Sequence, residues 1–233
     1  VKEFVNTCYP EFLYMDRNRY TFWPIAQDTF FASFMGVRYL ISEKPDLDDT
    51  KYKYLRQFGQ FFLYKNVKEA DIARFYENTV SEESLRKLCT GKKRKKNRER
   101  ILENYLVTED GADISDLSEL TEIPEAQKKS AVTLDAAEKD SHLTGSVSAQ
   151  ADGYVMCMIP WEKGWTVTVD GEKVQTQKGD LGFLAFQVDK GEHQLELTYQ
   201  VPGLKAGMAA GAVCWFIYIS ICFYQSRKKK RNL

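Results

Sequence analysis

The sequence predicts an α+β protein with a mixed α/β N-terminal part, a small antiparallel β-sandwich and one C-terminal transmembrane helix. Three observations support this. Helix-like and strand-like patterns alternate over residues 1–130, a period of two dominates 131–200, and residues 206–224 are apolar without a single charge. We expect four parts: a mixed extracytoplasmic segment over 1–130, the sandwich over 131–203, the membrane helix over 204–225 and a cytoplasmic basic tail over 226–233.

The composition of the 233 residues excludes some classes of protein. Lys plus Arg equals Asp plus Glu at 33 each, so the overall charge gives no argument for nucleic-acid binding. The five cysteines include no C-x-x-C pair, which argues against a zinc site or a disulfide framework, although one bridge from Cys89 to Cys8 or to Cys157 stays open. The chain begins with Val1 and shows no secretory leader, so we expect a fragment or a processed product.

Short elements are predicted in the first hundred residues. A helix is expected over 28–35 and is ended by Gly36, and strands are expected over 37–41 and 61–64. Ser81 is followed by two glutamates and has the chemistry of an N-cap. Residues 81–106 therefore predict a helix or a pair of helices.

Two oppositely charged blocks follow Ser81. Residues 86–100 hold nine cations and one anion, and residues 107–125 hold seven anions and no cation. A basic run attracts phosphates, so a phosphate-bearing molecule is one candidate partner. Neutralisation of one block by the other is the simpler explanation, because it needs no ligand.

Alternation of apolar and polar residues predicts the strands of the sandwich. In 165–169 the alternate residues Trp165, Val167 and Val169 share one face, and in 193–199 Leu195, Leu197 and Tyr199 do the same. Residues 154–159 form a nearly continuous apolar run, which we expect to be a strand buried on both faces. Asp170-Gly171 is the preferred sequence of a two-residue type I′ hairpin turn. Short strands at this spacing are typical of a small antiparallel sandwich.

The C-terminal apolar run has the length of a membrane span. Its 19 residues would form a helix of about 28 Å, close to the ~30 Å hydrocarbon core of a bilayer. Gly207 and Gly211 form a GxxxG pair. This pair either lets another helix pack closely or only makes the outer end of the helix less rigid. Five cations follow directly and predict a cytoplasmic C-terminus by the positive-inside rule: Arg227, Lys228, Lys229, Lys230 and Arg231.

The C-terminal pattern resembles the YfhO family of bacterial multi-pass membrane proteins. The resemblance depends on an ordered series of small motifs that ends in the apolar helix and its basic tail: an apolar strand ending at Pro160, Gly164-Trp165, Val169-Asp170-Gly171, Gly182-Phe183, Gly191 with His193, Tyr199 and Pro202-Gly203. Residues 34–41 and 63–66 also resemble the family's extracytoplasmic segment. Residues 70–74 depart from it, because the family usually has a proline-containing apolar patch there.

This resemblance implies a polytopic enzyme similar to GT-C glycosyltransferases. Such enzymes transfer sugar from a polyprenyl-phosphate donor, and some relatives are associated with glycosylation of lipoteichoic acid or related cell-surface polymers. The catalytic carboxylate of that class usually lies in an early extracytoplasmic loop that has no counterpart in this sequence. No catalytic residue is therefore carried onto this chain, and the expected partners are the bilayer, the lipid-linked sugar and the glycopolymer.

The remaining motifs assign no further chemistry. Only two histidines occur, no Gly-rich phosphate loop or G-x-S-x-G elbow is found, and we expect no cofactor and no metal. Trp161 and Trp165 are the expected glycan contacts, although at least one should belong to the core. The alternatives are a single-pass anchored sandwich that binds a glycan or a partner without catalysis, and a scaffold domain without a ligand.

Overall fold

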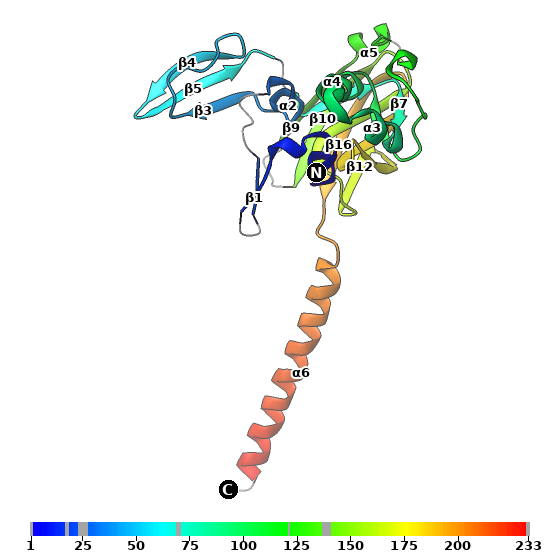
Figure 1. Cartoon of the computed structure of the whole chain (residues 1–233). Coiled ribbons are helices and arrows are strands. Elements are labelled where there is room, and N and C mark those ends of the chain that lie inside the picture. Colours follow the sequence, from blue (N-terminus) through cyan, green and yellow to red (C-terminus); the bar gives the residue numbers. More distant parts are fainter. Residues whose placement is uncertain are drawn as a thin grey trace.

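The computed structural model describes residues 2–16, 19–22, 28–68, 71–120, 122–136 and 141–231, with side chains omitted for 12–22, 136 and 225–231. A globular body carries one long helix that projects from it (Figure 1). The helices are α1 Lys2–Cys8, α2 Thr29–Phe34, α3 Glu82–Leu88, α4 Arg94–Asn104, α5 Glu125–Lys129 and α6 Leu204–Arg231. Three short 3₁₀ turns, Pro10–Phe12, Gly91–Lys93 and Leu117–Glu119, join the helical part.

Two antiparallel sheets form the β-sandwich that the alternating pattern predicts. The five-stranded sheet has the order β13-β12-β16-β10-β9, and the four-stranded sheet has the order β14-β15-β11-β6. The strands are β6 Ala73–Tyr76, β9 Ala131–Ala136, β10 His142–Ala149, β11 Gly153–Pro160, β12 Trp165–Val169, β13 Glu172–Val174, β14 Thr176–Gly179, β15 Phe183–Val188 and β16 Gly191–Tyr199. Alternate apolar residues from both sheets meet in one core, which confirms the α+β class.

The four-stranded sheet is buried on both faces. Val155, Cys157 and Phe186 face the five-stranded sheet, whereas Met156 and Ala185 belong to a second core under α1 to α4. This arrangement explains the continuous apolar run at 154–159, because a strand covered on both faces has no solvent side for polar residues. The body therefore has three layers: helices, a four-stranded sheet and a five-stranded sheet.

Strand β6 comes from the early part of the chain and completes the sandwich. It pairs with β11 through Tyr76 opposite Tyr154 and Ala73 opposite Cys157. The division of the chain into domains at residue 131 stays a prediction, and this strand joins the two sides of that division.

The helical layer follows its predicted capping signals. The Asp28 carboxylate accepts a hydrogen bond from the Phe31 amide at 3.0 Å, and Gly36 with φ +72° follows the end of α2. Ser81 Oγ accepts the Ser84 amide at 3.1 Å and caps α3. Helices α3 and α4 form the predicted pair over 81–106. Between this layer and the sandwich, the short strands β7 Thr79–Ser81 and β8 Leu106–Thr108 pair in parallel.

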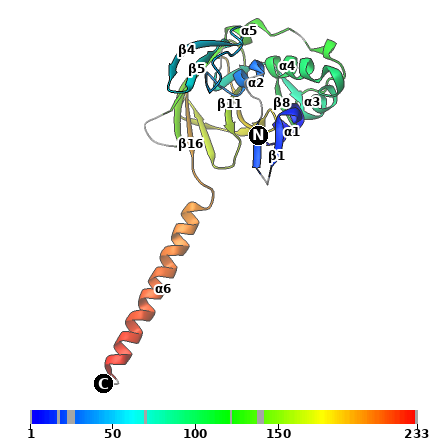
Figure 2. The ribbon, with the colours of Figure 1, turned by 60° about the vertical axis from the view of Figure 1, so that its left-hand side comes forward.

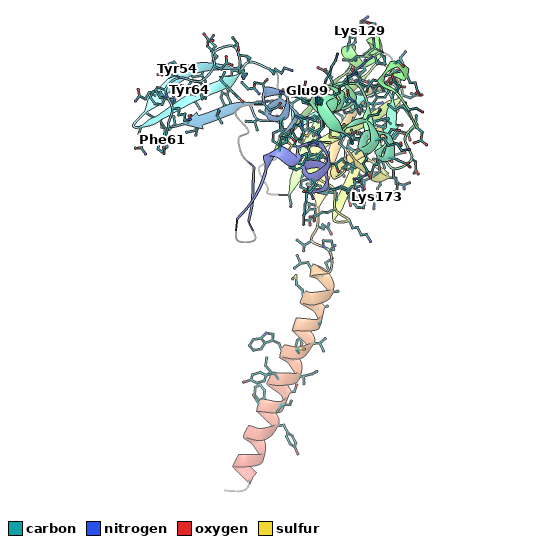
Figure 3. The ribbon with its side chains drawn as sticks, viewed as in Figure 1. Tyr54, Phe61, Tyr64, Glu99, Lys129 and Lys173 are labelled. Carbon is teal, nitrogen blue, oxygen red and sulfur yellow. The ribbon has the colours of Figure 1, made fainter. Side chains whose placement is uncertain are left out.

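A three-stranded sheet lies to one side of the body (Figures 1 and 2). It consists of β3 Tyr39–Ser42, β5 Phe61–Asn66 and β4 Tyr52–Phe58, in that order. Figure 3 shows Tyr54, Phe61 and Tyr64 on this sheet. The Tyr64 ring is buried and its hydroxyl donates to the Pro45 carbonyl, so the loop before β4 covers one face. A separate hairpin pairs β1 Leu13–Asp16 with β2 Arg19–Phe22.

Candidate functional site

Helix α6 has the properties of a membrane span. Its segment Leu204–Tyr224 has 21 residues with a mean hydropathy of 1.9, and none of that window is buried by the rest of the chain. Large apolar side chains are exposed all round it, with Trp215 at 66 % and Phe216 at 72 %. A helix this apolar on every side is stable in lipid and not in water. It is the single candidate span among the described residues.

A short connection holds the sandwich close to this helix. Strand β16 ends at Tyr199, and the chain turns through Gly203 with φ +81° into α6. The Gln200 amide donates to the Gly164 carbonyl at 3.0 Å, which fixes the connection to the loop before β12. The five cations predicted as the topology signal, residues 227–231, lie at the far end of α6 from the sandwich. Their predicted cytoplasmic side stays a prediction.

The predicted glycan contacts, Trp161 and Trp165, lie at the end of the sandwich nearest α6. Trp165 pairs with Tyr199 across the sheet, and their ring centroids are 5.1 Å apart. Both tryptophans are half-buried against the sandwich core. The Trp161 Nε1 atom is buried without a hydrogen-bond partner among the described residues. Contact with a glycan at these rings stays a prediction.

Two of the motif residues meet at the opposite end of the same strands. His193 Nδ1 lies 2.7 Å from the Asp170 carboxylate, and His193 Nε2 lies 3.1 Å from the Asp189 carbonyl oxygen. The Asp170 carboxylate also accepts the Gln194 amide at 2.8 Å. With acceptors at both ring nitrogens, the imidazolium form suits this site best. The hydrogen bond to Asp170 raises the pKa of His193 despite partial desolvation.

The Asp170–His193 pair fastens the predicted hairpin turn to β16. Asp170 and Gly171 both have positive φ, +53° and +84°, which confirms the type I′ geometry that Asp-Gly predicts. The amide of Gln194 is the first cause that lowers the pKa of Asp170, followed by its bond to His193. A histidine whose two nitrogens are both engaged has no free lone pair for base catalysis. This geometry favours a structural role for His193.

Five of the nine cations in the basic run form ion pairs among the described residues, and their partners lie outside the acidic block. Arg98 is 1 % exposed and lies 2.6 Å from a Glu11 oxygen and 3.0 Å from an Asp28 oxygen. Arg86 lies 2.5 Å from Glu3, and none of the ion pairs among the described residues joins 86–100 to 107–125. The acidic segment nevertheless lies against these helices, because the Ile114 amide donates to Ser84 Oγ at 2.9 Å and the Arg100 guanidinium donates to the Leu120 carbonyl at 3.3 Å. The pKa of Asp116 is lowered first by the Ser118 amide and also by the charges of Lys93 and Arg100. Neutralisation of one block by the other therefore stays a prediction, without direct ion pairs between the blocks among the described residues.

A polar groove of about 670 Å³ lies beside the Asp170–His193 pair. Its lining comes from the six strands β11 to β16 and their connections, and includes Tyr154 of β11, Gln177 of β14 and Gln187 of β15. Sequence reasoning missed this groove, since the residues are scattered over some forty positions and share no motif. The alternation of Gln175 and Gln177 was the only local signal.

No metal-binding arrangement of three or more His, Cys, Asp or Glu residues occurs in the part of the chain that the structure describes. The three cysteines outside helix α6, namely Cys8, Cys89 and Cys157, are free and buried. Burial raises the pKa of the Cys89 and Cys157 thiols to about 12. These thiols are therefore uncharged at neutral pH and are poor nucleophiles.

Comparison with known proteins identifies similarity in the C-terminal half. Residues 113–210 match the family model described as bacterial membrane protein YfhO. A segment of 93 residues is 33 % identical to the uncharacterised protein YfhO of Bacillus subtilis strain 168, and it covers 40 % of this chain and 10 % of that relative. The match thus spans about a tenth of the relative's length. No solved structure matches the chain.

Proposed function

We propose that this chain, whose residues 113–210 match the family model of bacterial membrane protein YfhO, forms the extracytoplasmic C-terminal portion of a membrane glycosyltransferase of that family. The whole protein would transfer sugar from a polyprenyl-phosphate donor to a cell-surface polymer such as lipoteichoic acid. The catalytic carboxylate would be supplied by a segment outside this sequence.

The observation that carries this proposal is the junction between the sandwich and α6. Only the residues from Gln200 to Gly203 separate the last strand from a lipid-exposed helix, so the sandwich lies close to the bilayer surface. A polyprenyl phosphate presents its sugar at that surface. In this position the sandwich can cover or shape the acceptor side of a membrane-embedded active site.

Deletion of the gene in the source bacterium tests this function. We expect the sugar content of the purified lipoteichoic acid and related polymers, measured by mass spectrometry, to fall to background because no other part of the protein remains. The wild-type gene should restore it. Trp161→Ala or Trp165→Ala should restore less sugar at equal protein level when the ring contacts acceptor. An unchanged glycan profile in the deletion strain contradicts the enzymatic function.

The polar groove favours a second candidate, a membrane-anchored sandwich that binds a glycan without catalysis. The two candidates differ in what surrounds the sandwich. The enzyme needs several further membrane spans in the same protein, whereas the binding protein needs α6 alone. An open reading frame that continues upstream of Val1 through about ten apolar segments would support the enzyme and contradict the single-pass binding protein.

A further inference from the structure

The groove lies at the end of the sandwich away from the membrane helix. Trp165 pairs with Tyr199 beside the connection to α6, while Val169 pairs with Leu195 further along the same strands. At ~3.3 Å per residue this separation is about 13 Å. The groove is therefore distinct from the tryptophan pair and lies at the end of these strands remote from α6.

The lining of the groove offers unused hydrogen-bonding groups. Gln175, Gln177 and Gln187 line it, and none of their amide side chains hydrogen-bonds another described residue. Each amide supplies two N–H donors and one carbonyl acceptor. Tyr154 also lines the groove, and its hydroxyl has no hydrogen bond to a described residue. Side chains that both donate and accept match hydroxyl groups, which do the same.

Apolar surface lies between these polar groups. Val169, Val174 and Val188 line the same groove, and Val188 is nearly buried in the sandwich core. A small ring with hydroxyl groups at its edge and C–H groups on its faces satisfies both kinds of lining. The volume lies within the usual range of roughly 300–1,000 Å³ for ligand pockets.

The charge of the groove excludes an anionic ligand. Three carboxylates line it, those of Asp170, Glu172 and Asp189, against the single imidazole of His193. Phosphate and carboxylate groups are repelled from such a site. A bound cation finds no support either, since no three of these side chains converge with metal-ligand geometry within the described structure.

We propose that this groove binds an uncharged sugar residue of a glycan. The Gln177 and Gln187 amides hold its hydroxyl groups, the valines contact its ring, and the Asp170–His193 pair holds the rim in place. The proposal deepens the function proposed above and rests on it for the class of polymer: the groove recognises the sugar substituent and not the phosphate backbone of a teichoic acid.

Titration of the full chain in detergent micelles tests the proposal. The probes are glucose, galactose and N-acetylglucosamine with their disaccharides maltose, lactose and chitobiose, followed by saturation-transfer NMR; glycerol phosphate is the anionic probe. We expect saturable binding of at least one sugar and none of glycerol phosphate. The double variant Gln177→Ala with Gln187→Ala should weaken binding about 10- to 100-fold, since each lost hydrogen bond costs roughly three- to tenfold.

Gln57→Ala is the matched control, because Gln57 is an exposed glutamine on β4, outside the groove. It should leave sugar binding unchanged, and all variants should keep the wild-type unfolding temperature. Absence of saturable binding for every sugar, or equal binding by the double variant and the wild type, overturns the proposal. The double variant could also lose sugar binding while polymer glycosylation in cells stays normal. That result would support sugar recognition by the groove and would show that the proposed transfer reaction does not require it.

Discussion

Asp180 is a carboxyl group enclosed by the protein at the turn between β14 and β15. Its Oδ1 atom accepts the Val107 amide at 2.8 Å, and its own amide donates to the Val107 carbonyl at 2.8 Å. The Oδ2 atom is buried without a partner among the described residues. Burial raises the pKa of Asp180 to about 7, against an ordinary value of 3.8. Asp180 thus connects β8 to the sandwich, but burial of its ionised carboxylate destabilises the folded protein.

Asp180→Asn should stabilise the protein at pH 8. The unfolded chain releases this proton near pH 4 and the folded chain near pH 7, so the wild type loses stability as pH rises between these values. The amide keeps the acceptor for Val107, carries no charge, and tolerates the positive φ of 44°. We expect the free energy of unfolding to rise by at most about 4 kcal/mol.

Chemical denaturation of both proteins at pH 4, 6 and 8 measures this difference. The variant should lack the decline that the wild type shows between pH 4 and 7. A parallel pH dependence in the two proteins would mean that Asp180 does not titrate in this range. Asp116→Asn is a suitable control, because Asp116 caps a short exposed turn and its pKa is lowered by the Ser118 amide.

At the level of secondary structure, the pairing of β6 with β11 depends on a glycine. A Cβ atom at Gly153 would lie 2.5 Å from the Tyr76 carbonyl oxygen and 2.6 Å from the Phe75 ring. The Tyr76 backbone cannot move away without breaking its pairing, so only glycine allows β6 and β11 to approach this closely. The same residue begins β11, the apolar strand that resembles the YfhO pattern.

Gly153→Ala should separate β6 from the sandwich. Overpacking of this kind costs about 1–3 kcal/mol, and the amides of Arg74 and Tyr76, which face β11 in the hydrogen-bonded pairs, should lose protection from hydrogen exchange before the rest of the sheet. Gly207→Ala in α6 is the matched control, since an added Cβ there meets no atom within 4 Å. Unchanged protection at Tyr76 would show that the sheet absorbs the methyl group.

The elements with local signals could be predicted from the sequence. Asp170-Gly171 specifies its own turn, Ser81 caps its own helix, and the uncharged run in α6 needs no partner to be recognised. The insertion of β6, the burial of Arg98 against Glu11 and Asp28, and the groove depend on contacts between distant residues. Such contacts leave no periodic trace, because each side contributes only one or two residues.

The orientation of the whole molecule in the membrane is open to a direct test. The three cysteines outside α6 are buried, and the other two, Cys214 and Cys222, lie on α6. The wild-type chain should therefore react little with a polar thiol reagent. Lys173 is exposed on the sandwich (Figure 3), and Leu233 ends the basic tail. A cysteine at each position reports one side of the bilayer.

Lys173→Cys should react with a membrane-impermeable maleimide on intact cells, whereas Leu233→Cys should react only after permeabilisation. The five cations at 227–231 are the reason, because such clusters remain on the cytoplasmic side. Mass-tag gel shifts measure both reactions, with the wild type as background. The reverse pattern would place the sandwich in the cytoplasm and end the proposal of surface-polymer chemistry.

The shared sheet also constrains biogenesis. Tyr76 leaves the ribosome long before its partner Tyr154, and pairing across so many residues makes this closure slow. An amino-terminal piece that ends near residue 130 would carry β6 as an unsatisfied edge, which is a site for aggregation. On the proposed extracytoplasmic side, export would deliver an incomplete sheet first, and the body would close only after β11 had also crossed the membrane.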